Sequence, residues 1–183
     1  HHMTTADKMP PHDVEAEECV LGSILIDTSA LNRVRAVIKP KDFYIVKNQW
    51  AFEAMLSLKA SNQPIDAVTL RRELEISGKL DEIGGPAFIT YLMTVVPTAI
   101  HAAGYASIVA RLAVDRRILT NASDMAKLAY DGEKQPGEKL SALYEMVREL
   151  SVSSGRSSPI RVSATELLDD VEAWAEKNKN MKG

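Results

Sequence analysis

The stretch "PPHDVEAEECVLGSILID", residues 10–27, carries the signals that decide the fold. Asp13 is a good helix N-cap, and the three glutamates that follow it favour the positive end of a helix dipole. Apolar residues then recur at helical spacing. We therefore predict a first helix that begins near Val14 and stops by Asp27, with Gly22 as a close-packing point within it.

The same stretch raises the question of a catalytic site, because it also holds a histidine and the only cysteine of the chain. His12 lies outside the predicted helix, seven residues before Cys19, and Cys19 sits in an apolar run. We interpret Cys19 as a buried structural thiol rather than a nucleophile. The glutamates have a simpler use as charges at the helix start: Glu15, Glu17 and Glu18.

The composition favours a soluble, all-α protein. Of 183 residues, 45% are hydrophobic, 26% are charged and only 5% are aromatic. The formal net charge of -3 leaves no basic footprint, which argues against strong direct binding to nucleic acid. A single cysteine excludes a disulfide framework, and no apolar run reaches the roughly 18 to 20 residues of a membrane span. These features predict a cytoplasmic protein.

Four further short helices are expected to complete a compact multi-helix head. We predict them at 30–38, at about 47–60, from Asp66 to a C-cap at Gly78, and in a last segment that ends near Val96. Their predicted inward residues are Trp50, Ala51, Ala54, Met55 and Leu58, and then Val68, Leu70 and Leu74.

A long helix over 101–131 should pair with a helix over 138–150 as an antiparallel hairpin. The long helix carries two apolar stripes about 100° apart, and a lone hairpin cannot bury both. The second stripe therefore indicates another surface, and we favour oligomerisation. The first stripe holds Tyr105, Ile108, Val109, Leu112, Leu119 and Ala126; the second holds Ile118, Ala122, Met125 and Ala129.

The serine-rich segment "SVSSGRSSP" predicts a flexible linker, after which a capping box starts a last amphipathic helix. That helix either folds back onto the head or docks in a groove of a neighbouring subunit. We expect five parts: a tag remnant and disordered leader at 1–12, a globular helical head at 13–100, the hairpin at 101–151, a flexible linker at 152–162 and a linker helix at 163–180.

Sequence motifs for nucleotide or metal binding do not occur in the chain: GxxxxGK[ST], GxGxxG, HExxH, CxxC and GxSxG are all missing. We therefore predict no catalytic, cofactor-binding or metal-binding residue. Arg116 and Arg117 suit a solvated helix edge, or pairs with Asp115 or Asp124, better than a phosphate contact.

The opening stretch resembles the N-terminal domain of bacterial or phage replicative DNA helicases of the DnaB family, with Pro-His, then E-A-E, then V-L-G. The resemblance continues in order through "DFY" at 42–44, "PID" at 64–66, "GKLDEIGG" at 78–85 and "VPTAIHAAGYASIV" at 96–109. The hairpin is similar in pattern rather than in motif, and the last helix takes the place of the family's linker helix.

This resemblance implies a non-catalytic collar domain that pairs subunits into dimers and a hexameric ring of three dimers. It also implies recruitment of the primase C-terminal domain at the replication fork, with a loader or initiator as a further partner. ATP and Mg²⁺ are expected only for a RecA-like motor domain that this sequence lacks.

We assign the predicted contacts to three sets of residues. The oligomer interface of the hairpin comprises Leu119, Leu140, Leu143, Tyr144 and Val147. The partner-facing residues are Ile118 and Met125. The docking face of the linker helix comprises Leu167, Leu168, Val171 and Trp174. Two other classes stay open: an independent helical DNA-binding module, and a small enzyme that uses Cys19.

Overall fold

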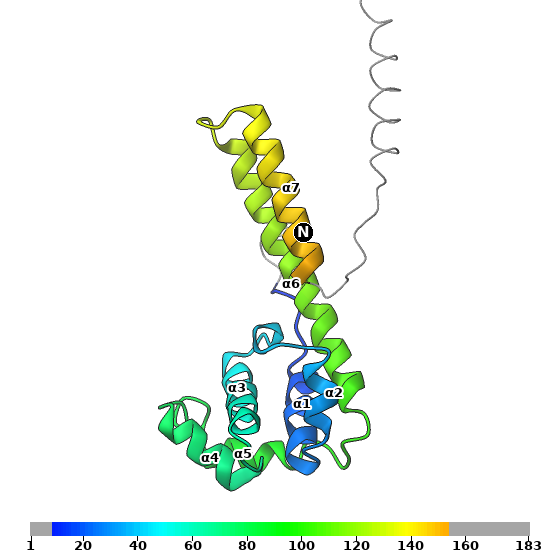
Figure 1. Cartoon of the computed structure of the whole chain (residues 1–183), viewed down its shortest axis with the longest axis vertical. Helices are drawn as coiled ribbons and strands as arrows, with labels where there is room; N and C mark the ends of the chain where they lie inside the picture. The colour runs from blue at the N-terminus through cyan, green and yellow to red at the C-terminus, as the bar shows by residue number, and fades with distance from the viewer. Residues whose placement is uncertain (1–8, 154–183) are drawn as a thin grey trace, which may run out of the picture. The chain divides into compact units, whose positions relative to one another are not determined.

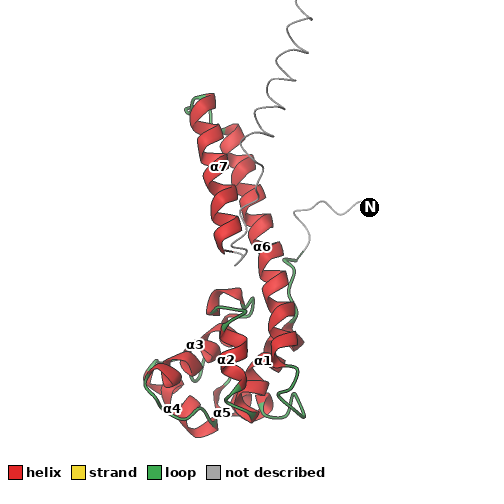
Figure 2. Cartoon of the chain, turned by 45° about the vertical axis from the view of Figure 1, so that its right-hand side comes forward, coloured by secondary structure: helices red, strands yellow, loops and turns green. Residues whose placement is uncertain are grey.

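The computed structural model describes residues 9–153, and every regular element in this range is helical (Figures 1 and 2). The all-α fold class is confirmed. The elements are α1 (Val14–Ile26), α2 (Ala30–Arg35), the 3-10 helix η2 (Pro40–Asp42), α3 (Val46–Ala60), α4 (Ala67–Ile76), α5 (Gly85–Leu92), α6 (Ala102–Tyr130) and α7 (Pro136–Ser153). No helix between residues 9 and 153 is both long and apolar enough to cross a membrane.

The chain divides into two compact units, one ending at Leu119 and one beginning at Thr120. We call their described parts the head unit, residues 9–119, and the hairpin unit, residues 120–153. The boundary falls inside α6, so this one helix contributes to both units.

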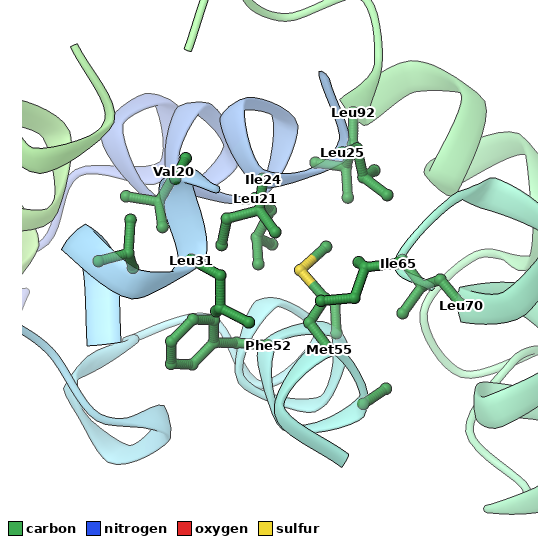
Figure 3. Packing of buried hydrophobic residues seen from close by; sticks show 14 of the residues in the cluster. Val20, Leu21, Ile24, Leu25, Leu31, Phe52, Met55, Ile65, Leu70 and Leu92 are labelled. Atoms are coloured by element: carbon green, nitrogen blue, oxygen red, sulfur yellow. The ribbon is translucent and has the colours of Figure 1, made fainter. Parts of the chain in front are cut away.

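The central helix of the head unit is α1, which begins and ends where the sequence predicts. The Asp13 side chain caps it by accepting the Ala16 N–H at 2.9 Å. All ten residues from Ala16 to Leu25 are buried, because α2, α3 and α5 all pack against this helix. Figure 3 shows its apolar side chains lying over those of α3.

The core of the head unit joins residues far apart in the sequence (Figure 3). Phe52 and Met55 of α3 are fully buried, whereas Trp50 is only partly buried and lies under the Lys79 ammonium. The sequence predicted Trp50 inside and missed Phe52. The reason is that α3 packs against α1, α4 and η2, so its buried face is wider than a single stripe.

For helix α4, one of the predicted inward residues is wrong. Leu70 and Leu74 are buried as expected, but Val68 is 76% exposed. The Asp66 carboxylate accepts the N–H groups of Val68 and Thr69 and so fixes how the helix begins. At about 100° per residue, Val68 then points away from the face that Leu70 and Leu74 share.

Two helices are shorter than predicted. Helix α2 ends at Arg35, and the residues up to Ile38 form a turn, while α5 ends at Leu92 instead of reaching Val96. The end of α5 lies directly over Gly22, where an added Cβ would collide with the Leu92 carbonyl oxygen. Gly22 is therefore the predicted close-packing point.

The hairpin unit consists of residues 120–130 of α6, a short turn and α7. In the turn, the Asp131 carboxylate accepts the Glu133 N–H at 2.9 Å, which lowers the pKa of Asp131. Lys139 of α7 reaches back to the Ala129 carbonyl oxygen at 3.2 Å. Among the described residues of this unit, only Leu128 is buried.

Candidate interaction surfaces

Glu17 of α1 caps another helix rather than its own. Its carboxylate is 1% exposed and accepts the Tyr44 N–H at 2.6 Å, the Ile45 N–H at 3.2 Å and the Asn48 amide at 2.9 Å. Ile45 is the N-cap residue of α3 and provides no side-chain cap. The charge of Glu17 therefore stabilises the start of α3, not the start of α1 as the sequence predicted.

Glu18 is also held within the head unit. The Tyr91 hydroxyl donates to Glu18 Oε2 at 2.7 Å, and this hydrogen bond raises the pKa of Tyr91. Lys47 Nζ lies 3.9 Å from Glu18 Oε1 and 4.0 Å from the centre of the Phe88 ring. Of the three glutamates, only the exposed Glu15 keeps the predicted role of a charge at the helix start.

Cys19 is 6% exposed, which confirms the prediction of a buried thiol. Burial raises its pKa, and the nearby carboxylates of Glu15, Asp13 and Glu18 raise it further. The neutral thiol therefore dominates near pH 7, which is the opposite of what a nucleophilic cysteine needs. Within the part of the chain that the structure describes, no group of three His, Cys, Asp or Glu side chains could hold a metal ion.

Arg116 and Arg117 of α6 bind the loops of the head unit. Arg116 donates to the carbonyl oxygens of Pro11, at 2.8 Å, and of Asp42. Arg117 forms an ion pair with the Asp42 carboxylate at 3.1 Å, so its acid is neither of the two that the sequence suggested. Burial lowers the pKa of Arg116, although the charges of Glu17 and Asp42 oppose this effect.

The predicted leader is anchored at its last residues. Besides the hydrogen bond from Arg116 to Pro11, the His12 ring stacks on Tyr44 with 4.3 Å between centroids. The guanidinium of Arg116 also lies 5.4 Å from the centre of the Tyr44 ring. Residues of the "DFY" motif thus contact both the last residues of the leader and α6. The sequence of the motif alone did not reveal these contacts.

An apolar stripe lies exposed along α7. Leu140, Tyr144 and Val147 follow one another at spacings of four and three, so they share one helix face, and they are 67%, 70% and 43% exposed. Leu143 lies about 40° from Val147 on the same side of the helix, but it is partly buried. The α7 residues predicted for the interface therefore lie along one side of the helix, with Leu143 less exposed than the other three.

Of the other predicted contact residues, some belong to the head unit and some to the hairpin unit. Ile118 and Leu119, at the end of the head unit, are 47% and 50% exposed, and Met125 of the hairpin unit is partly buried. The predicted docking face of the linker helix lies outside the described residues: Leu167, Leu168, Val171 and Trp174.

A family model described as "DnaB-like helicase N terminal domain" matches residues 9–111, more than half of the chain. The chain belongs to this family. The match covers α1 to α5 and the first part of α6, and so it includes the whole Glu17 and Cys19 region. These buried groups are therefore structural parts of a helicase N-terminal domain.

Similar curated proteins are replicative DNA helicases. The chain is 32% identical over 182 residues to "Replicative DNA helicase DnaB" from Leifsonia xyli subsp. xyli. The alignment covers 97% of this chain and 39% of that protein. It is also 32% identical over 180 residues to the protein of the same name from Geobacillus stearothermophilus. That alignment covers 97% of this chain and 40% of the relative. The chain thus spans about two fifths of the length of these relatives.

Solved structures of DnaB N-terminal domains share the fold. The crystal structure from Mycobacterium tuberculosis is 34% identical, has a TM-score of 0.74, and covers 77% of this chain and 99% of its own. The N-terminal domain of DnaB helicase from Helicobacter pylori, described with its interactions with primase, is 21% identical with a TM-score of 0.56 over 64% of this chain and 91% of its own. At that identity the second match supports the fold alone.

Proposed function

We propose that the chain is the assembly and recruitment domain of a replicative DNA helicase, without a catalytic site of its own. The exposed stripe of Leu140, Tyr144 and Val147 on α7 carries this proposal. Full burial of a large apolar side chain contributes about 1.5–3 kcal/mol, so covering the part of each that is still exposed would contribute about 1–2 kcal/mol, which a monomer leaves unused. A second copy would supply the same stripe across a two-fold axis.

Membership of the DnaB family supports a larger assembly. We propose that three such dimers form the collar of a six-subunit ring in the cytoplasm. ATP, Mg²⁺ and DNA unwinding then belong to a motor domain that follows the N-terminal domain, and the linker helix docks on the motor of the adjacent subunit through Leu167, Leu168, Val171 and Trp174.

Light scattering tests the pairing of subunits. At high micromolar concentration we expect the 183-residue chain to have the mass of a dimer or a larger oligomer, and the double variant Leu140→Ser/Tyr144→Ser to be monomeric with unchanged helix content. Val152→Ser is the matched control, because Val152 is 71% exposed on the same helix but lies off the stripe. A wild-type monomer, or equal dissociation by the control, would refute the pairing.

We also propose that primase docks on this domain through Ile118 and Met125, with a loader or initiator as a further partner. Support comes from the exposure of Ile118 and from membership of the DnaB family, one of whose N-terminal domains, from Helicobacter pylori, is described with its interactions with primase. Binding of a primase C-terminal domain, measured by calorimetry, should weaken at least about tenfold for Ile118→Glu. The control Ile100→Glu, at a residue that is 76% exposed elsewhere in the head unit, should leave it unchanged.

A further inference from the structure

Helix α4 presents an unusual solvent-facing stripe. Val68 and Ile76 are 76% and 74% exposed, and Arg72 lies midway between them at a spacing of four residues. Successive members of this stripe are rotated by only about 40°, so all three share the face opposite the buried Leu70 and Leu74. Two large aliphatic groups thus stand about 12 Å apart with a cation between them.

The local demands of a helix do not explain these residues. Val and Ile lose side-chain freedom in a helix, and at exposed positions Ala, Glu or Lys would favour the helix more. Burial does not compensate either, because both side chains remain in water. Some use outside the isolated chain accounts better for two such residues on a ten-residue helix.

Arg72 lies on this stripe and Arg71 borders it, about 60° from Val68, and both side chains are exposed. Neither guanidinium group forms a hydrogen bond or an ion pair with another described residue. In contrast, Arg116 and Arg117 of the same unit are held by loop carbonyls and by Asp42. The guanidinium groups of α4 are therefore available to an external carboxylate, which arginine binds with two parallel hydrogen bonds.

We propose that this face of α4 docks an acidic amphipathic helix of another protein. Two apolar side chains of that helix, eight positions apart, would cover Val68 and Ile76, and carboxylates between them would pair with Arg71 and Arg72. The docking face is preorganised, because Asp66 and Thr69 cap the start of α4 reciprocally and Leu70 and Leu74 hold the helix on the core. The proposal is independent of the pairing proposed for α7.

Nucleic acid fits this face less well than an acidic helix. A phosphate backbone has no use for the two aliphatic side chains, and its charges are uniformly negative, whereas a peptide helix can place a carboxylate beside Arg72 and leave the position opposite the exposed Glu75 uncharged. The formal net charge of the chain is -3, so no wider basic surface extends the two arginines.

A designed peptide tests the proposal through fluorescence anisotropy. The probe is a labelled helical peptide with two leucines eight positions apart and glutamates between them on the same face; the control peptide carries its glutamates on the opposite face. We expect the first peptide to bind the 183-residue chain more tightly than the control. Binding should fall at least about tenfold for Arg71→Glu/Arg72→Glu, and similarly for Val68→Ser/Ile76→Ser.

Two further measurements separate docking from a general effect of charge or folding. Arg35→Glu, a charge reversal at an exposed arginine of α2, should leave the affinity unchanged. A peptide with lysines in place of the glutamates should bind the Arg71→Glu/Arg72→Glu variant better than it binds the wild type, which shows that this variant is folded and that the charges meet.

Three results would overturn the proposal. The peptide fails to bind, or binds all variants equally. Labelled duplex DNA binds instead and depends on the same two arginines. The oligomer mass in light scattering falls when Val68 and Ile76 are replaced, which would mean that a second copy of the chain covers this face.

Discussion

The head unit and the hairpin unit are built in opposite ways. In the head unit, large side chains such as Leu21, Phe52 and Met55 are fully buried in a core to which helices α1 to α6 all contribute. In the hairpin unit, only Leu128 is buried among the described residues, and Tyr144 is 70% exposed. The head unit therefore has the core of an independent folding unit, whereas the described part of the hairpin unit leaves nearly all of its apolar side chains at least partly exposed.

The hydrogen bonds and ion pairs of the two units differ as their cores do. Glu17 and Arg116 of the head unit bind groups that are distant in the sequence, and both are withdrawn from water. The ion pairs of the hairpin unit link residues three positions apart on the surface: Asp124 with Lys127, Asp131 with Lys134, and Glu145 with Arg148. Such exposed pairs contribute little to stability.

The largest expected effect is that of truncating a core aromatic. Phe52→Ala should reduce the unfolding free energy of the head unit by about 3–5 kcal/mol, because it removes a fully buried ring and leaves a cavity. Tyr144→Ala should change that free energy by less than about 0.5 kcal/mol. Urea denaturation followed by circular dichroism measures both. Similar losses for the two variants would show that the units are not built differently.

Removal of the buried carboxylate is next in size. Glu17→Ala should cost about 3 kcal/mol, since it leaves the N–H groups of Tyr44 and Ile45 and the Asn48 amide unsatisfied. Glu17→Gln keeps one acceptor oxygen and should cost less. Glu145→Ala in the hairpin unit removes only an exposed ion pair, and in the same denaturation experiment its effect should lie within about 0.5 kcal/mol.

Replacing two glycines by alanine should change the stability by smaller amounts, and in opposite directions. Gly22→Ala should destabilise the head unit by about 1–3 kcal/mol, because the new methyl group forces α1 away from the Leu92 carbonyl oxygen. Gly104→Ala, in α6, meets no atom within 4 Å and should instead stabilise by about 0.5–1 kcal/mol. Thermal unfolding of the two variants should therefore shift in opposite directions; a shift in the same direction would rule out the close approach at Gly22.

Local signals made most of the fold predictable from sequence. The cap at Asp13 and the turn at Asp66 fixed where α1 and α4 begin, and Gly22 marked a close approach. The wrong predictions concern residues whose burial depends on which other elements surround their helix. Phe52 is buried because three elements surround α3, and Val68 is exposed because no element within residues 9–153 covers the far side of α4.

The candidate surfaces were less predictable, because periodicity gives the faces of a helix but not what covers them. Glu17 and Arg117 have the residue types of surface charges, and only their long-range partners at Asn48 and Asp42 reveal a buried role. The spacing on α7 likewise grouped Leu143 with Tyr144, but it did not reveal that Leu143 is partly buried while Tyr144 is 70% exposed.

The smallest predicted effect is a pH dependence that tests how α4 is held. Backbone N–H donation, from Thr69 most of all, lowers the pKa of Asp66 in the folded chain. The ionised carboxylate therefore contributes its full stabilisation above the ordinary aspartate pKa of about 4, and this contribution disappears as the pH falls through the lowered value. Asp66→Asn retains a cap that does not titrate.

The wild type should therefore exceed Asp66→Asn by a few tenths of a kcal/mol at pH 7, and this advantage should shrink in acid. Urea denaturation from pH 7 down to acid measures the difference. Asp131→Asn is the control from the hairpin unit: the pKa of Asp131 is also lowered by a backbone N–H, but its turn lies outside the head unit. If this control changed the unfolding of the head unit with pH as much as Asp66→Asn does, the two units would unfold together, and their separate construction would have no thermodynamic consequence.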